Sequence, residues 1–554
     1  MSLRLRPGGS GEQAASGTGT AGGGVAGRRG FGRRRGSAGE VRFDRRQTWL
    51  LAVCCVAQFM VILDLSIVNV ALPSIQVSLG FTAIGLQWVV AAYAIVFAGF
   101  LMLGGRVSDR FGQRRALIAA LVLFSAASLA GGAAPDANLL IVARGVQGLG
   151  GAMMAAASLA AITSSFPQGQ LRHRAIGLWG AMNGAGGAAG TLLGGILTEG
   201  LGWRWVLLIN PPIGIAAAIA AYLVVQDRRS EVRSKFDLAG ALTLTGGLVV
   251  LAYGIVNAGA LGWASVGTIL PLVLGAVLLA AFAYVEMRVA AFPLVPLREV
   301  TGQLRVANTI VLLFSAALFP MWYVSSLYLQ QVLGLSPLDA GLAFFPMALV
   351  IMLAAQRAGR LVGRFGVRKV LACGLTMMAT GMLLLARINS SGSAVGYVVF
   401  PGLLVAAGIG LSIVPSTIAA TQGARAERAG LASGLVNTAR QVGGAIGITL
   451  LISIATQYSS HLIGDNRMVS QSLTDGFRLA YLIAAGLVLA AALVTVTRLP
   501  RPAATAAVAS AGPPGQPAAG ERAAGEPAVG EPAAGEPAGA PPHRDADPRR
   551  LPAG

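Results

Sequence analysis

Long apolar segments separated by short charged ones dominate this chain. The charged residues gather between stretches that carry almost no charge. A helix of about 20 apolar residues crosses the hydrocarbon core of a bilayer. Helices are the default spanning form, because a segment in lipid must satisfy its own backbone hydrogen bonds. The alternating strands that are typical of an outer-membrane barrel are absent from the sequence. The pattern predicts an all-α polytopic membrane protein.

We predict fourteen membrane spans along the apolar part of the chain. They lie at residues 49–69, 86–104, 116–134, 139–164, 175–197, 204–224, 238–258, 267–285, 306–330, 338–356, 369–387, 396–421, 430–456 and 478–497.

The distribution of loop charge supports this number. With the N-terminus in the cytoplasm, the loops on the far side of the membrane carry only four basic residues, which are Arg204, Arg387, Arg467 and Arg478. All the other loop arginines and lysines fall in cytoplasmic loops, as the positive-inside rule expects. One span more or fewer would break this alternation. An even number of spans places both charged tails in the cytoplasm.

An internal repeat divides the spans into halves. The sequences GRVSDRFGQRR (105–115) and GRLVGRFGVRK (359–369) share six of eleven positions, and each follows the second span of a six-span group. Repeated halves place a binding site between them, near the middle of the bilayer. We therefore expect a basic N-tail (1–46), a six-helix bundle (47–226), a linker with two extra helices (227–300), a second six-helix bundle (301–498) and a disordered C-tail (499–554).

Composition excludes several other classes. The chain has 55% hydrophobic and 12% charged residues and a net charge of +20. Its basic residues lie at helix ends and in the tails rather than in a stripe with stacking aromatics, so we expect no nucleic-acid partner. Its three cysteines and three distant histidines suggest no metal site. The sequence has no phosphate-binding GxxxxGK[ST] loop, so we expect no ATP hydrolysis and no cofactor.

At this point the sequence resembles the major facilitator superfamily, and specifically its fourteen-helix drug:proton antiporter branch. The similarity covers roughly residues 45–498. It is carried by the segments LDLSIVNVALPSIQ (63–76), GGRVSDRFGQRR (104–115), RGVQGLGGA (144–152), WRWVLLINPPIG (203–214) and YLQQVLGLSPLDAG (328–341).

The resemblance implies the major facilitator fold, with two six-helix bundles plus two extra central helices. It implies proton-coupled efflux of small amphipathic or cationic organic compounds by alternating access, in the plasma membrane of a bacterium. The partners would be protons, the substrate and the lipid bilayer, and we expect a monomer. One departure concerns the fifth span, where Gly190-Thr191 replaces the branch's Gly-Pro pair. This weakens the inference of export direction.

Two charged residues inside spans are candidates for proton coupling. Asp64 lies well inside the first span, and a carboxylate in hydrocarbon costs about 3 kcal/mol or more. That cost favours a group which gains and loses a proton as its surroundings change. Arg144, near the start of the fourth span, stays charged and could pair with Asp64. The alternatives are a structural carboxylate capped by Asn69 or by a nearby backbone group, and an arginine that extends to the interface.

Three further groups of residues have predicted roles. The resemblance implies a gating loop, in which an acid between glycines meets a helix end or an arginine and favours one access state: Gly105, Asp109, Arg110, Gly112 and Arg114. Glycines in the fifth span should allow close helix packing: Gly186, Gly190, Gly194 and Gly195. Polar residues that could line a cavity, or equally join helices, are Asn69, Asn183, Gln331 and Arg440. For Arg440 we favour a structural or gating role.

Other functions stay open at this stage. A transporter of the same fold could import its solute, or could export a lipid or an amino acid. A membrane sensor that does not transport would need no proton-exchanging residue. An enzyme is the least favoured hypothesis, because no nucleophile–base set stands out in the sequence.

Overall fold

The computed structural model describes residues 43–167, 169–227, 237–290, 302–422, 429–464 and 468–500. The chain divides into two compact units, Met1–Arg501 and Pro502–Gly554. Every described residue belongs to the first unit, and the regular secondary structure of these residues is entirely helical. The predicted disorder of the two tails concerns residues that lie almost entirely outside the described ranges.

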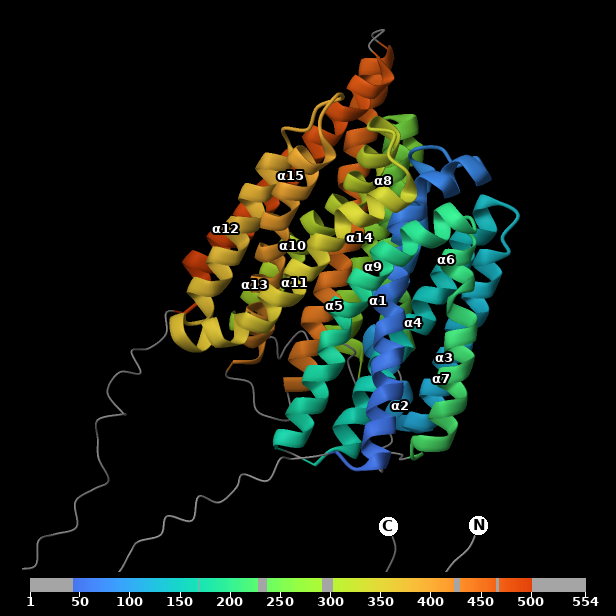
Figure 1. The fold of residues 1–554 in the computed structure, drawn as a ribbon, viewed down its shortest axis with the longest axis vertical. Coiled ribbons are helices and arrows are strands. Elements are labelled where there is room, and N and C mark those ends of the chain that lie inside the picture. The colour runs from blue at the N-terminus through green and yellow to red at the C-terminus, as the bar shows by residue number, and fades with distance from the viewer. Residues whose placement is uncertain are drawn as a thin grey trace, which may run out of the picture. The chain divides into compact units, whose positions relative to one another are not determined.

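The helices form two groups with a pair between them (Figure 1). The first group consists of α1 (Arg45–Leu79), α2 (Trp88–Phe111), α3 (Gln113–Gly132), α4 (Ala137–Ser165), α5 (Gln170–Gly200), the short α6 (Trp205–Leu208) and α7 (Asn210–Val224). The pair is α8 (Leu238–Leu261) and α9 (Val266–Tyr284). The second group consists of α10 (Gly302–Leu327), α11 (Pro337–Phe365), α12 (Val367–Leu385), α13 (Phe400–Thr421), α14 (Ala429–Gly464) and α15 (Val469–Arg498).

Thirteen stretches of the described helices are long and apolar enough to cross a membrane. The α5 helix, with 31 residues, is also long enough. It falls short only in hydropathy, because glycines replace larger apolar residues along it. Counting α5, the predicted fourteen-helix membrane architecture is confirmed.

Local sequence signals set the start and end of α1, the helix that carries Asp64. The Asp44 carboxylate accepts from the Gln47 backbone N–H at 2.7 Å, and the Gln47 side chain accepts from the Asp44 N–H at 3.1 Å. This reciprocal capping satisfies two of the free N–H groups at a helix start. Gly80 ends α1 in the left-handed conformation, at φ 66°, which glycine adopts without steric cost.

The two groups repeat the same order of helix packing. In the first group α1 packs on α5, α2 on α4, and α3 on both α4 and α7. In the second group α10 packs on α14, α11 on α13, and α12 on both α13 and α15. The α5–α11 and α2–α14 contacts join the groups. The internal repeat seen in the sequence therefore corresponds to two related helix bundles, which we call the first and second halves.

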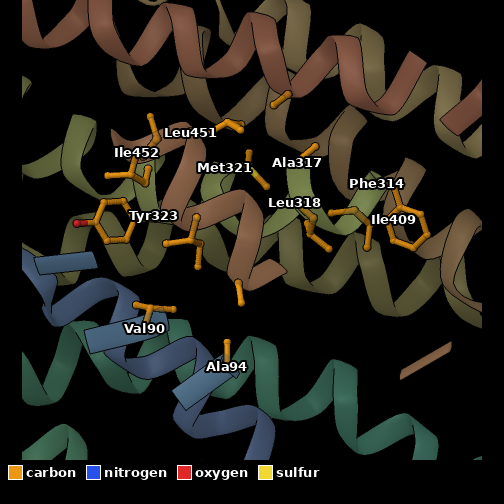
Figure 2. Packing of buried hydrophobic residues seen from close by; sticks show 14 of the residues in the cluster. Val90, Ala94, Phe314, Ala317, Leu318, Met321, Tyr323, Ile409, Leu451 and Ile452 are labelled. Carbon is orange, nitrogen blue, oxygen red and sulfur yellow. The ribbon is translucent and has the colours of Figure 1, made fainter. Parts of the chain in front are cut away.

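The inserted pair lies at the junction of the halves. The α8 helix packs on α9, on α2 and on α14. The main hydrophobic cluster also crosses the junction. Figure 2 shows Val90 and Ala94 of α2 on one side of this cluster and Met321 and Leu451 of the second half on the other.

The predicted gating loop is largely helical, which corrects its placement. Residues 105–111 form the end of α2, so Gly105 and Asp109 lie within a helix. Only Gly112, at φ 95°, breaks the chain before α3 begins. The related segment in the second half belongs to α11 up to Phe365, with Gly366 at φ 82°. The predicted spans ended too early here, because arginines end an apolar run without ending the helix.

Candidate functional site

A cavity of about 200 Å³ lies between the two halves. Its walls come from α1, α2 and α5 of the first half and from α10, α11, α13 and α14 of the second. Most lining residues are apolar, and Phe319, Trp322 and Phe344 supply aromatic rings. An apolar pocket with a few polar groups between related halves is typical of a small-molecule site.

Four polar side chains line this cavity, namely Ser66, Asn69, Asn183 and Thr191. The predicted cavity positions Asn69 and Asn183 are therefore at the cavity. Their amide N–H groups bond to their own helices, to the Leu65 carbonyl and the Gly180 carbonyl respectively, both at 2.8 Å. Asn183 also accepts from the Gln58 side chain at 3.0 Å.

Asp64 and Arg144 form a buried ion pair at 2.5 Å. The arginine also donates through Nη1 to the Gln147 side chain at 2.8 Å and through Nε to the Val89 carbonyl at 3.0 Å. Its guanidinium lies 4.6 Å from the centre of the Tyr93 ring. The pairing considered from the sequence is present, and Arg144 does not extend to an interface.

Two amides complete the shell of the Asp64 carboxylate. Gln147 Nε2 donates to Oδ1 at 2.7 Å, and Asn210 Nδ2 donates to the same oxygen at 3.1 Å. Both amides also donate to the Ser128 hydroxyl at 3.1 Å. The alternative of a cap by Asn69 is not realised, because the Asn69 amide donates to the Leu65 carbonyl and its side chain lines the cavity.

The sequence prediction missed Gln147, Asn210 and Ser128. Gln147 carried a usable signal, since it follows Arg144 by three residues and so shares its face of α4. Asn210 carried a weaker one. Pro211 and Pro212 start the α7 helix after the break at Ile209, as proline at a first helical position favours. The same restart places the Asn210 side chain beside Asp64.

The ion pair lies outside the cavity. Asp64 and Arg144 are fully buried and are not lining residues. The cavity side of α1 presents Ile62, Leu65 and Ser66, and Asp64 lies on the other side of the helix, toward α4 and α7. The pair joins elements of the first half only.

Glycines of α5 bring that helix close to α1. A Cβ on Gly186 would lie 2.9 Å from the Phe59 carbonyl oxygen, and one on Gly190 would lie 2.9 Å from the Leu63 carbonyl oxygen. Gly194 meets the Ile67 carbonyl in the same way, at 2.8 Å. Gly195 faces the second half instead, 2.8 Å from the Pro337 carbonyl oxygen.

Hydrogen bonds join the halves where α1 ends and α11 begins. We call this the distal end of the bundle, and we call the opposite end, where α1 begins and α2 stops, the proximal end. Four of the side-chain contacts between described residues that cross there are Ser326 to the Asn69 carbonyl at 2.6 Å, Gln330 to the Val70 carbonyl at 2.9 Å, Gln331 to Gln76 at 2.7 Å, and Gln87 to Ser453 at 3.3 Å. Gln331 belongs to this contact rather than to the cavity lining.

A carboxylate completes the distal contact. The Leu338 backbone N–H, in the first turn of α11, donates to Glu199 at the end of α5 at 2.9 Å. An acid at a helix N-terminus is favoured by the helix dipole and by the free N–H groups there. The distal side of the cavity is therefore closed by polar contacts between the halves.

The arginine-rich segment at the proximal end, residues 105–115, does not make the contact that was expected for Asp109. Asp109 is exposed, and the charge that acts on it is Arg106, on its own helix. Arg114 lies over the Tyr222 ring, and Arg115 pairs with Asp227, just after α7, at 3.1 Å. These contacts fix the start of α3 within the first half. In this conformation Asp109 makes no latch contact with another described helix.

The remaining candidates are Arg440 and possible metal ligands. Arg440 lies in α14 and is not a lining residue of the cavity. Among the described residues, no group of three histidine, cysteine, aspartate or glutamate side chains is placed to hold a metal ion.

Comparison with known proteins agrees with this architecture. A model of the Major Facilitator Superfamily matches residues 54–448. The puromycin resistance protein pur8 of Streptomyces alboniger is 38% identical over 456 residues, which cover 82% of this chain and 90% of that protein. The cephamycin export protein CmcT of Amycolatopsis lactamdurans is 39% identical over 412 residues, covering 74% and 85%.

Solved structures share the fold at low sequence identity. A bacterial homolog of the human lysosomal transporter Spinster, in an inward-facing and unoccupied conformation, aligns with a TM-score of 0.58 and 15% identity, over 83% of this chain and all of that one. A D-xylose–proton symporter aligns with a TM-score of 0.59 and 14% identity, over 82% and 98%. The chain is thus a multi-pass membrane protein that belongs to the Major Facilitator Superfamily.

Proposed function

We propose that this protein exports small amphipathic organic molecules from a bacterial cell in exchange for protons. The observation that carries the proposal is the cavity between the halves, with apolar and aromatic walls and four polar side chains. Such walls suit a molecule that is apolar over most of its surface. The two relatives are named a resistance protein and an export protein, which supports movement of the substrate out of the cell.

The proposed orientation places the proximal end and both termini in the cytoplasm. The arginine-rich ends of α2 and α11 lie at the proximal end, where the positive-inside rule expects them. The distal contacts then form a closed outer gate, and export requires that they open. The proposal includes a monomer in the plasma membrane, with the lipid bilayer and protons as its partners and with no nucleic acid.

In this proposal Asp64 carries the proton. Arg144 and a proton compete for the same carboxylate, so protonation would release the arginine and loosen α1 from α4. Because α1 also lines the cavity and holds part of the outer gate, that change would reach both. The proton must first gain access to a buried group, so the scheme requires α1 to move during the cycle.

Transport in inverted membrane vesicles tests the function. Vesicles with wild-type protein should accumulate amphipathic compounds when an inside-acid pH gradient is imposed, and collapse of the gradient should stop accumulation. Asp64→Asn should lose gradient-driven uptake. In a pump-deficient bacterium, only wild type should raise resistance to the same compounds. Equal resistance from wild type and Asp64→Asn would remove the proton role of Asp64.

The other candidates give different results in the same vesicles. An importer would release substrate from the vesicles rather than gather it. An exporter of a lipid or an amino acid would move those solutes and leave the drug panel untouched. A sensor would move no compound, and its Asp64→Asn variant would keep the wild-type phenotype.

A further inference from the structure

Arg440 carries a positive charge that no described residue neutralises. Its Nε atom is buried without a hydrogen-bond partner, and no hydrogen bond or ion pair joins its guanidinium to another described side chain. The side chain as a whole is half-buried. An unpaired charge inside a membrane protein is costly unless water or a ligand reaches it. Arg144, by contrast, has its charge neutralised by Asp64, although its Nη2 atom is also buried without a hydrogen-bond partner.

The helix geometry places Arg440 on the proximal side of the cavity. Arg440, Gly444 and Ile448 recur every four residues and so share one face of α14. Ile448 lines the cavity, and a Cβ on Gly444 would lie 2.7 Å from the ring of Phe319, another lining residue. Arg440 is about 12 Å from Ile448 along the helix axis, toward the proximal end. Side chains of a helix lean toward its N-terminus. The N-terminus of α14 lies at the proximal end, so the guanidinium points toward that end.

A second polar atom without a partner lies in the same layer. Gly443 packs against Leu312, and Gly447 packs against Ala316, so α14 and α10 run parallel with a fixed offset. The same offset places Asn308 beside the turn that carries Arg440. Asn308 Oδ1 is buried without a partner, while its Nδ2 donates to the Leu304 carbonyl at 2.8 Å. An amide and a guanidinium together offer the polar atoms that hold an oxyanion and an adjacent donor group.

The charges around the cavity favour an anion over a cation. None of the described residues that line the cavity is charged. Asp64 is the acid that the sequence suggested for this region. It lies on the side of α1 that faces away from the cavity, and it pairs with Arg144. We propose that Arg440 binds the negatively charged group of an amphipathic substrate on the proximal side of the cavity, while the apolar part enters the cavity. This inference rests on the proposed export function and narrows its substrate class to compounds with a carboxylate, sulfonate or similar oxyanion.

Two dyes that differ in one sulfonate test this site by binding. Anilinonaphthalene sulfonate is anionic, and phenylnaphthylamine is the same ring system without the sulfonate. Purified protein in detergent should bind the anionic dye about tenfold more weakly after Arg440→Ala, as expected for the loss of a hydrogen bond to a charged group. Binding of the neutral dye should change less than about twofold. Arg440→Lys keeps the charge and should fall between wild type and Arg440→Ala. Arg498→Ala, which removes an exposed arginine at the end of α15, should leave both dyes unchanged.

Three results would overturn the inference. Equal weakening of both dyes by Arg440→Ala would assign Arg440 to structure or gating. Unchanged binding of both dyes would remove it from the site. Preferential binding of the cation ethidium by wild type would reverse the assigned substrate charge. Reconstitution with and without anionic lipid separates the source of the oxyanion, because strong competition by the lipid would make a headgroup the occupant instead of a substrate.

Transport separates this inference from the proposed function. If wild-type vesicles move both dyes and Arg440→Ala loses only the anionic one, both proposals hold. If wild type moves the dyes but the charge preference survives Arg440→Ala, the inference alone fails. If wild type moves neither dye nor any compound of the panel, export fails, and the dye-binding measurement still decides whether Arg440 holds an anion.

Discussion

Asp64 of α1 and Arg144 of α4 form an ion pair at 2.5 Å inside the first half, on the side of α1 that faces away from the central cavity. Gln147 and Asn210 supply further hydrogen bonds to the carboxylate. The pair therefore joins α1, α4 and α7, while the opposite face of α1 contributes to the cavity. A change in the charge of Asp64 can reach the cavity through movement of α1, or through α2, because Arg144 donates to the Val89 carbonyl and Val90 lines the cavity.

Removing the arginine should destabilise the protein strongly. Arg144→Leu leaves the Asp64 carboxylate buried without its counter-charge, and breaking a buried pair from one side costs about 3–5 kcal/mol. Unfolding by a denaturing detergent should show this loss in the free energy of unfolding. The double variant Arg144→Leu/Asp64→Asn should recover at least half of it, because no charge is then left unpaired. Purely additive losses in the double variant would show that the two residues are not coupled.

The Asn210 amide should contribute less than the arginine but more than a surface amide. Asn210→Ala removes two hydrogen bonds, to Asp64 and to Ser128, each 3.1 Å long. We expect the free energy of unfolding to fall by about 1–3 kcal/mol. Asn257→Ala removes an amide whose bond to the Gly267 carbonyl is exposed, and it should change that free energy by less than about 0.5 kcal/mol. Similar losses in both variants would contradict a special role for the shell around Asp64.

The helices and their halves could be predicted from the sequence because one rule dominates in lipid. Long uncharged runs must be helical, and loop charges fix their alternation. The ends of α2 and α11 were missed because arginines terminate the apolar run while the backbone stays helical as far as Gly112 and Gly366.

The site could be predicted only in part, because it depends on which helix faces meet. Asp64 and Arg144 stood out as charges inside spans, and each charge in lipid needs a partner. Asn210 and Ser128 are small polar residues of a kind that also occurs throughout the other spans. Only the packing of α7 on α1 brings Asn210 to Asp64, and only the packing of α3 on α7 brings Ser128 to Asn210. Gln331 was assigned to the cavity for its polarity alone, and it lies instead in the distal contact.

Close packing of α5 on α1 should make Gly190 intolerant of a side chain. A Cβ there would lie 2.6 Å from the Ser66 Cβ and 2.9 Å from the Leu63 carbonyl oxygen, so the helices would have to separate. We expect Gly190→Ala to lower the free energy of unfolding by about 1–3 kcal/mol. Gly177→Ala, on the same helix with nothing within 4 Å, should be neutral or should stabilise by up to about 1 kcal/mol. A stable Gly190→Ala variant would indicate that the α1–α5 contact is looser than the structure shows.

The distal contact should open more readily when Glu199 is removed. Glu199→Ala deletes the acceptor of the Leu338 N–H and a negative charge at the N-terminus of α11. A cap of this kind contributes about 1 kcal/mol, so the ratio of distally open to closed molecules should rise about fivefold. Spin labels at Val77 of α1 and Leu342 of α11, both exposed, would report this as a greater share of long distances.

Asp136→Ala is the matched control, because Asp136 caps α4 at the same end but within one half, accepting from Asn138 at 2.9 Å and Leu139 at 3.0 Å. Its loss should lower stability without changing the label distances. An identical distance distribution for Glu199→Ala and wild type would mean that the Ser326, Gln330 and Gln331 contacts hold the distal end closed without the carboxylate.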